Sequence, residues 1–297
     1  MNKVDSLKKR LERATEGKER VIAKRYAQLY RDINAMLSEY YRKYETAGKL
    51  TYVEMVKYQR LEKMLIEVNE LINDSEQVLR NEIRRHLREQ YRESYYQTSF
   101  ILETTAQAKI GYSALKSEVI DEAINTNFTG LTLNERLSRR RSELIYSMRE
   151  TIIRGLHEGQ TYRTMSKLIQ EELEGDRAKA QRIVRTEAHR TRESASYNSV
   201  LYAESKGVVM MKTWNNVDDE RSRPDHLAID GETIPATEKF DVGGHEADYP
   251  SDPELPASQS INCRCYLTYD IERIERPQHE ELADLTYAEW QKERLSD

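Results

Sequence analysis

Apolar residues recur every three or four positions through the first 206 residues, and this periodicity limits the possible folds more than any other feature of the sequence. Residues 3–46 contain no proline, and an apolar stripe that starts with Val4 resumes in a shifted phase at Ile22. The shift coincides with Gly17, which costs about 1 kcal/mol relative to alanine in a helix and could allow a bend or a break. The pattern predicts a long amphipathic helix that must pair with other helices to cover its apolar face.

Several later helix starts can be placed from residues whose side-chain oxygens cap helices. Thr132, followed three positions later by Glu135, forms a capping box. Because glycine favours helix ends, Gly175 is expected to end one helix. The expected starts are Thr51, residues 73–75, Thr132, Thr161 and Asp176, and the last helix should reach Ser205.

At Gly207 the sequence changes to a pattern typical of a small mixed domain. Residues 208–214 favour a strand, all six prolines lie from Pro224 onward, and residues 261–271 supply a second strand. The fold class is therefore mainly α, with an extended N-terminal helical bundle or coiled-coil-like arm and a small α+β C-terminal domain. The expected divisions are the arm at 1–130, a helical segment at 131–206, the α+β domain with a His/Cys cluster at 207–275, and a C-terminal helix or tail at 276–297 with Leu282, Leu285 and Trp290 on its apolar face.

The net charge of −5 hides two oppositely charged halves. Residues 207–297 contain 9 lysines and arginines against 21 aspartates and glutamates, whereas residues 1–206 contain 38 against 31. A basic helical half can approach nucleic-acid phosphates, which would repel the acidic half. Two ordinarily solvated surfaces explain the same composition, so the charge alone leaves both interpretations open.

The sequence lacks the features of secreted and membrane-inserted proteins. Its first residues alternate in charge, without the apolar segment of a signal peptide. The longest aliphatic or methionine run, at residues 208–211, is far shorter than the roughly 20 residues of a membrane span. Cys263 and Cys265 lie one residue apart, where a disulfide would be strained. We therefore expect a soluble protein that is made in a cytoplasm and contacts no membrane.

Two thiols and two imidazoles gather in the C-terminal region, and they are ligands that tetrahedral zinc prefers. Cys263, Cys265 and His226 are the first candidate ligands, and His245 is the fourth. A zinc ion would stabilise a loop-rich domain that has little core. The Cys-x-Cys spacing is tighter than that of most zinc knuckles, and two buried thiols acting as small apolar side chains are an alternative. A cysteine- or zinc-dependent hydrolase, with a cysteine nucleophile activated by His226, is another.

Short motifs follow one another in order between about residues 150 and 270. They are Arg185 and Glu187 in a helix, Trp214 at a strand end, Asp219 with Arg221, Arg223 and His226, the pair Asp230-Gly231, residues 250–256, and Asn262-Cys263-Arg264-Cys265. This series resembles the minor head proteins of tailed bacteriophages, the head-morphogenesis family related to the phage Mu minor head protein. Family members often carry threonine between the two arginines, where this chain has Ser222.

The resemblance implies a structural protein of the virion and not an enzyme. It implies a low-copy protein inside the head near the portal vertex, acting in head assembly and in DNA packaging or ejection. The implied partners are the portal protein, the major capsid or scaffolding protein, and packaged double-stranded DNA, with assembly in the host cytoplasm. Contacts to phosphate would be independent of sequence. The candidate side chains for contact with phosphate are Lys8, Lys9, Arg10, Arg13, Arg139, Arg140 and Arg141. An ordinary solvated surface residue is the alternative interpretation of each.

Overall fold

The computed structural model describes residues 3–217, 219–275, 282 and 285–296, and it divides into two compact units. Unit 1 comprises residues 1–15, 84–133 and 185–297, and unit 2 comprises residues 16–83 and 134–184. Both units combine segments that are distant in the sequence, whereas we expected contiguous divisions. The reason is that long helices fold back along one another, so that residues far apart in the chain pack together.

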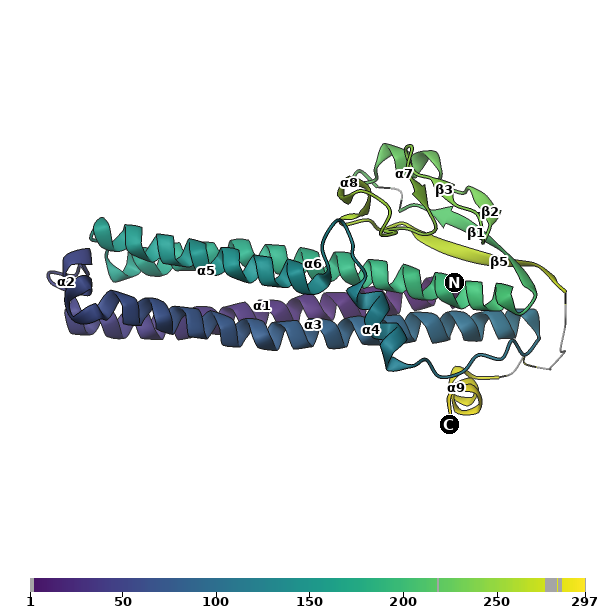
Figure 1. Ribbon diagram of the computed structural model, residues 1–297, viewed down its shortest axis with the longest axis horizontal. Coiled ribbons are helices and arrows are strands. Elements are labelled where there is room, and N and C mark those ends of the chain that lie inside the picture. The colour runs from purple at the N-terminus through teal and green to yellow at the C-terminus, as the bar shows by residue number, and fades with distance from the viewer. Residues whose placement is uncertain (1–2, 218, 276–281, 283–284, 297) are drawn as a thin grey trace. The chain divides into compact units, whose positions relative to one another are not determined.

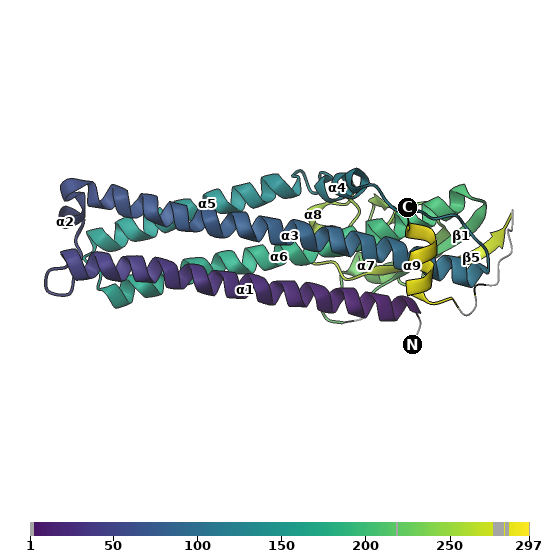
Figure 2. The ribbon, with the colours of Figure 1, turned by 90° about the horizontal axis from the view of Figure 1, so that it is seen from below.

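Helices dominate both units, which confirms the mainly α fold class (Figure 1). The four long helices are α1 (Lys3–Tyr44), α3 (Arg60–Ala106), α5 (Leu133–His157) and α6 (Tyr162–Ser205). In unit 2 their segments lie side by side and form the expected bundle (Figure 2). A short helix, α2 (Tyr52–Val56), and a 3-10 turn at Lys57–Gln59 join α1 to α3. Thr51 caps α2 as predicted, because its hydroxyl accepts a hydrogen bond from the backbone N–H of Glu54.

Two helix boundaries expected from the sequence are wrong. Residues 73–75 lie inside α3, and Gly175 and Asp176 lie inside α6. The apolar stripe continues through the first of these sites, since Ile72 and Leu79 are both buried. The stabilisation from burying such side chains exceeds the cost of about 1 kcal/mol for a glycine in a helix.

Unit 2 buries a cluster of charged side chains, with one member from each of its four long helices. Arg140 of α5 makes ion pairs with Glu76 of α3 and Asp176 of α6. Tyr26 of α1 donates a hydrogen bond of 2.5 Å to Asp176. Arg140 is only 3% exposed, and burial raises the pKa of Glu76 and of Asp176. We call these four residues the Arg140 cluster.

Unit 1 contains a three-stranded antiparallel sheet in the order β2, β1, β5. β1 (Val208–Asn215) and β5 (Tyr266–Ile274) correspond to the two expected strands, although β5 begins five residues later than residue 261. Two short elements accompany them, β2 (Thr233–Pro235) and a hairpin of β3 (Phe240–Asp241) with β4 (Glu246–Ala247). The small core of this region consists of Trp214, Phe240, Val242, Ala247, Leu255, Cys263, Cys265 and Leu267.

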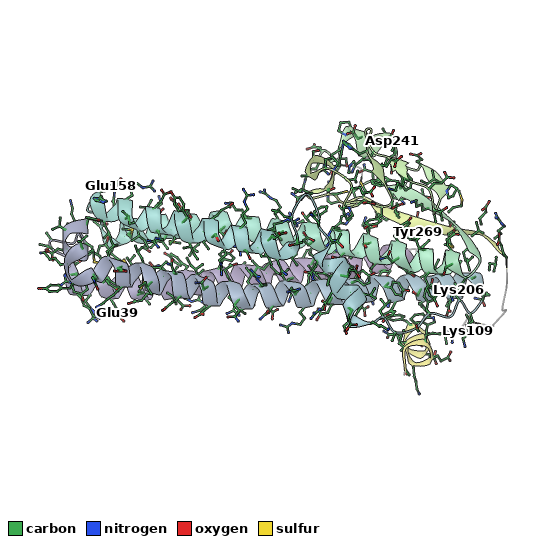
Figure 3. The ribbon with its side chains drawn as sticks, in the orientation of Figure 1. Glu39, Lys109, Glu158, Lys206, Asp241 and Tyr269 are labelled. Carbon is green, nitrogen blue, oxygen red and sulfur yellow. The ribbon has the colours of Figure 1, made fainter. Side chains whose placement is uncertain are left out.

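The sheet packs against the part of α6 that belongs to unit 1 (Figure 1). Leu267 of β5 donates its backbone N–H to Glu193 of α6 at 3.2 Å, and the Tyr197 hydroxyl donates to the carbonyl of Ala236 at 3.1 Å. Tyr269 of β5 lies between the strand and α6 (Figure 3), where burial and then Glu193 raise its pKa. The helix therefore forms one wall of the small domain.

Four short helices complete unit 1: α4 (Ser117–Asn125), α7 (Pro224–Ala228), α8 (Ala257–Ser260) and α9 (Tyr287–Leu295). α9 packs on α3 through the carboxylate of Glu103, which is fully buried and accepts hydrogen bonds from the Trp290 indole at 2.7 Å and from Arg294 at 3.1 Å. Trp290 and Leu282 are both buried, but Leu282 and Leu285 precede α9, so of the three residues expected on its apolar face only Trp290 belongs to the helix.

Candidate metal centre

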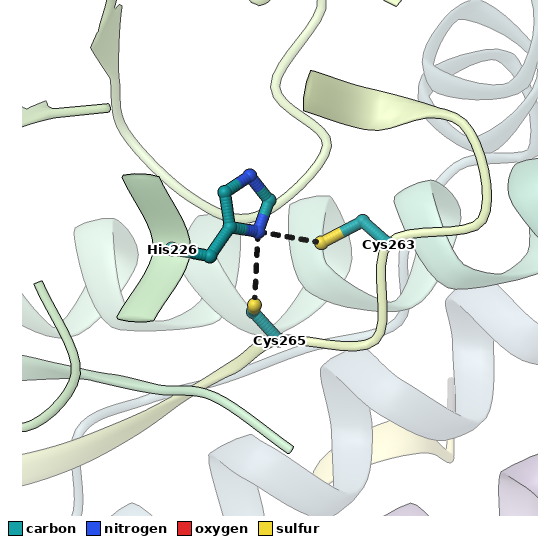
Figure 4. A group of neighbouring side chains, drawn as sticks. All are labelled: His226, Cys263 and Cys265. Atoms are coloured by element: carbon teal, nitrogen blue, oxygen red, sulfur yellow. Dashed lines mark hydrogen bonds between the residues drawn. The ribbon is translucent and has the colours of Figure 1, made fainter. Parts of the chain in front are cut away.

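Three side chains that can bind a metal converge in unit 1. The Nδ1 atom of His226 lies 3.1 Å from the Cys265 sulfur and 3.7 Å from the Cys263 sulfur (Figure 4). All three candidate ligand atoms lie within 4.8 Å of one another, and all three residues are buried. The structure thus brings together three of the four metal ligands expected from the sequence.

A chain of hydrogen bonds orients the His226 ring. Gln259 of α8 donates from its amide nitrogen to Asp225 at 2.5 Å, so that its amide oxygen faces the His226 Nε2 atom at 3.0 Å. This arrangement favours a proton on Nε2, because an amide oxygen can only accept. The lone pair of Nδ1 then points at the two sulfurs. A ring held this way by an outer partner is typical of histidines that bind metals.

The two thiols affect each other's proton affinity. The hydrogen bond between them lowers the pKa of Cys263 and raises the pKa of Cys265. The rings of His189 and His226 lower the pKa of Cys263 further, and the Trp214 indole opposes the rise at Cys265. Cys263 is therefore the thiol that ionises first.

The loop that carries the cysteines is held by residues of the ordered motif series. The guanidinium of Arg223 donates to the carbonyl of Ile261 at 2.5 Å, and the backbone N–H of Asn262 donates to the Thr186 hydroxyl at 3.3 Å. Arg264 forms a two-pronged ion pair with Asp219. Motifs that are 76 residues apart in the chain thus meet at one loop.

The other motif residues have structural or exposed positions. Glu187 is buried in α6 and pairs with Arg190 at 3.0 Å, and Trp214 is fully buried with its ring edge against His226. Arg185 and Arg221 are exposed.

His245, the fourth ligand expected from the sequence, is not part of this group. It is exposed in the turn between β3 and β4, and its backbone hydrogen-bonds to Val242. The turn geometry of the hairpin places its side chain on the surface. A different histidine, His189 of α6, is buried beside Cys263, and the sequence analysis did not assign it to the site. The sequence does not show that Asn262 contacts Thr186. Without that contact, nothing in the sequence indicates that His189, three residues after Thr186, lies near the cysteines.

The basic residues expected to contact DNA have mixed positions. Lys9, Arg10, Arg13 and Arg139 are exposed, and two of them make surface ion pairs, Arg10 with Glu93 and Arg139 with Glu143. Lys8 is half-buried with its amine 3.4 Å from the centre of the Tyr266 ring.

Two members of the basic triplet in α5 are not freely exposed. Arg140 is buried in the Arg140 cluster, so its expected role in binding DNA is wrong: a helix that packs on three others must turn one side of a basic triplet inward. Arg141 is partly buried, with its Nε atom enclosed.

A row of arginines on α3 was missed in the sequence analysis. Arg85, Arg88 and Arg92 are exposed and follow the three-four spacing of one helix face. With Glu89 of the same helix and Ser117 and Ile120 of α4 they line a hollow of about 500 Å³. Arg88 makes a two-pronged ion pair with Asp121 at 2.7 Å. The three-four spacing of these arginines is visible in the sequence, but periodicity alone does not show which face of the helix is exposed.

Within the described residues, no helix is both long enough and apolar enough to cross a membrane.

Comparisons with known proteins agree with the order of the motifs. Residues 146–268 match the family described as Phage Mu protein F like protein. The chain is 29% identical over 300 residues to minor head protein GP7 of Bacillus phage SPP1, covering 98% of this chain and 97% of that protein. No solved structure matches.

Two further relatives differ in what their names describe. The chain is 28% identical over 276 residues to the NAD(+)-arginine ADP-ribosyltransferase EFV of Enterococcus faecalis, covering 91% of this chain but only 56% of that protein. It is 30% identical over 97 residues to the uncharacterised protein YqbB of Bacillus subtilis, 31% of either chain. The likeness to the SPP1 protein extends over nearly the whole of both chains, and the family match contains the Cys/His site. The chain is therefore similar over nearly its whole length to a phage minor head protein, and its residues 146–268 resemble the Mu protein F like family.

Proposed function

We propose that this minor head protein lies inside the phage head close to the portal vertex and contacts packaged double-stranded DNA through unit 1. The position near the portal rests on the family resemblance. The contact with DNA rests on the row formed by Arg85, Arg88 and Arg92, whose spacing presents three guanidinium groups on one exposed helix face. Arginine suits this role because its planar group binds phosphate with two parallel hydrogen bonds.

The exposed start of α1 could extend the same electrostatic surface. Lys9, Arg10 and Arg13 are exposed and belong to unit 1, as does the arginine row. Surface ion pairs such as that of Arg10 with Glu93 are weak, at about 0–1 kcal/mol, so phosphate can displace the carboxylate. We expect binding without base specificity, because flexible basic side chains on a helix surface read phosphate and not base edges.

Binding of the full chain to a short duplex tests the contact with DNA. The logarithm of the association constant should fall linearly with the logarithm of salt concentration, by about 0.9 per phosphate contact. Changing Arg85 and Arg92 to glutamine should reduce that slope by about 2. The matched control changes Arg139 and Lys167, two exposed basic residues of unit 2, and should leave the slope unchanged. Equal effects of the two double variants would refute the assignment to unit 1.

Mass spectrometry of purified virions tests the position in the head. The protein should be present at low copy in full heads and should co-purify with the portal protein from disrupted heads. Its loss from heads after DNA release would indicate ejection with the genome. Absence from both procapsids and virions would overturn the proposal.

A structural role for the cysteines is part of this proposal. Cys263 is 5% exposed and Cys265 is 2% exposed, so a substrate has no open approach to either sulfur. A nucleophilic thiol needs such an approach as well as an activating imidazole. The chain covers only about half of the relative that is named an ADP-ribosyltransferase. We propose that the region the two proteins share has a structural role in the phage head.

A further inference from the structure

The spacing of the three converging ligand atoms fits a tetrahedral metal ion. Zinc binds sulfur at about 2.3 Å and imidazole nitrogen at about 2.0–2.1 Å, which places neighbouring ligand atoms roughly 3.5 Å apart. The Nδ1 atom of His226 lies 3.1 Å and 3.7 Å from the two sulfurs. A structural zinc site has four protein ligands, so one more is required.

The backbone around the cysteines is anchored on α6 on either side of His189. Asn262, just before Cys263, donates to Thr186, and Leu267, just after Cys265, donates to Glu193. His189 follows Thr186 by three residues and precedes Glu193 by four, so all three lie on one face of the helix. His189 therefore lies on the face of α6 against which the cysteine loop is anchored, next to the Cys263 thiol.

The His189 ring has an available ligand atom. Its Nε2 atom is buried and makes no hydrogen bond to any residue that the structure describes. The ring nevertheless lies close enough to the Cys263 thiol to affect its proton affinity. A buried polar atom without a partner is uncommon in proteins, and a bound ion is one way to satisfy it.

Two more buried groups near the sulfurs lack partners. The indole N–H of Trp214 approaches Cys265 but forms no hydrogen bond of ordinary geometry within the described residues, and neither does the amide nitrogen of Asn216. The Asn216 oxygen is instead placed 3.4 Å from the Cys265 sulfur. Turning that amide over would let both N–H groups donate to a thiolate, which accepts hydrogen bonds that a thiol does not need. The surroundings of Cys265 thus suit the ionised, metal-binding form of the residue.

We infer that His189, His226, Cys263 and Cys265 bind one zinc ion in a closed tetrahedral site that joins α6, α7 and the loop before β5. Two thiolates and two imidazoles form a set that selects zinc among the common divalent metals by geometry and ligand type. Each thiol loses a proton when its sulfur binds the metal. The role is structural, because four protein ligands leave no position open for water or substrate.

One local adjustment accompanies binding through the Nε2 atom of His189. The ring proton must then lie on Nδ1, which is 3.4 Å from the guanidinium of Arg192. A guanidinium can only donate, so the two groups would repel each other. Arg192 keeps Thr15 and Gln90 as partners at 3.3 Å and 3.4 Å, and we expect it to turn toward them.

Native mass spectrometry of the full chain, produced with zinc and under reducing conditions, tests the site directly. The expected mass is that of the chain plus one zinc ion minus two protons, which reports both stoichiometry and ionised thiols. Cobalt replacement should give the intense visible absorption of tetrahedral cobalt together with a sulfur charge-transfer band. Absence of bound metal, or octahedral cobalt without that band, would overturn the inference.

Variants distinguish the fourth ligand. His189→Gln should weaken zinc binding by more than about 100-fold, since loss of an outer partner alone costs about 10–100-fold. His245→Gln is the matched control, because it removes the exposed histidine of the same domain, and it should change affinity by less than about twofold. Gln259→Ala should fall between them, at about 10–100-fold. If His189→Gln binds as tightly as the wild type, or if His245→Gln binds more weakly, the assignment of His189 is wrong.

Some ligand variants could fail to fold, so a measurement on the unchanged chain is also needed. Adding a strong chelator to the wild-type protein should lower its Tm, and adding zinc back should restore it, because binding to the folded state stabilises it. An unchanged Tm with metal demonstrably removed would contradict a structural zinc site. This outcome is independent of DNA binding by the arginine row.

Discussion

Both units bury polar side chains, but the two sets differ in whether their members satisfy one another. In the Arg140 cluster of unit 2, one guanidinium meets two carboxylates and a phenol, so donors face acceptors. At the Cys/His site of unit 1, two sulfurs converge with the imidazole of His226, while the nearby N–H groups of Trp214 and Asn216 have no hydrogen-bond partner among the residues that the structure describes. A cluster whose charges are matched internally needs nothing more, whereas a cluster of converging ligand atoms is completed by a cation.

The Arg140 cluster stabilises its unit directly, whereas the Cys/His site would stabilise its unit through a bound metal. Removing one member of a matched buried cluster leaves its partners uncompensated, and the effect is on folding. Removing a ligand from a metal site acts first through metal affinity and only then through folding. Substitutions in the Arg140 cluster should therefore lower the free energy of unfolding more than substitutions of exposed charges.

The largest effect should come from Arg140→Met in unit 2. The substitution leaves Glu76 and Asp176 buried without their cation and should lower the free energy of unfolding by about 3–5 kcal/mol. Because burial already raises the pKa of both carboxyl groups, they take up protons more readily in the variant, and its deficit should be smaller at pH 4 than at pH 7. Denaturant unfolding of the full chain at the two pH values measures this.

The control for that prediction lies one residue away. Arg139 is exposed and pairs with Glu143 on the surface of the same helix, so Arg139→Met should change the free energy of unfolding by no more than about 1 kcal/mol. Similar losses in the two variants would mean that the buried cluster is not the source of stability.

A smaller effect is expected from Glu103→Gln, which weakens a matched buried cluster within unit 1. The neutral amide cannot balance the buried Arg294 guanidinium and should cost about 1–3 kcal/mol. Hydrogen exchange of residues 285–296 should accelerate in the variant, because Glu103 holds α9. Glu293→Gln removes an exposed partner of the same arginine and should have no comparable effect.

A pH-dependent effect is expected at Lys212, which is fully buried in β1 and donates to the carbonyl of Asp248 at 2.9 Å. Burial lowers the pKa of Lys212 to about 8 from 10.5. The folded protein thus loses this proton before the unfolded chain does, and wild-type stability gains from this group as the pH rises from about 8 to 10.5. The free energy of unfolding of the wild type should rise relative to Lys212→Met by up to about 3 kcal/mol across that window.

Equal pH profiles of the two proteins would show that Lys212 is not desolvated. Thermal unfolding in matched buffers at pH 7.5 and pH 10 is sufficient to decide this.

The smallest effect should come from Asp219→Asn beside the cysteine loop. Arg264 and the backbone of Arg221 hold the pKa of Asp219 at about 2, but the carboxylate is exposed. Its contribution is therefore present at neutral pH and is lost only as the pH falls through about 2. We expect an unchanged Tm at pH 7 and unchanged zinc binding. A clear loss of Tm or of zinc binding would show that the exposed pair of Asp219 with Arg264 positions the cysteine loop. Exposed ion pairs, and not only buried clusters, would then stabilise unit 1.

The sequence by itself determined the fold class and the resemblance to phage minor head proteins. Three-four periodicity predicted the helical bundle, the change at Gly207 predicted the mixed domain, and the motif order predicted the phage head protein family. These properties are readable because periodicity and capping are local, and each depends on residues within a few turns of one another. The sequence also predicted His226, Cys263 and Cys265 as candidate ligands, because histidine and cysteine are the residue types that zinc prefers.

Only the tertiary structure decided which polar residues meet. It placed Arg140 inside the bundle, continued α3 and α6 through their expected ends, and put His189, not His245, next to Cys263. These outcomes depend on contacts between segments that are tens of residues apart. A helix has only one buried face, and the neighbours that cover it decide which of its charged and ligand-bearing side chains point inward.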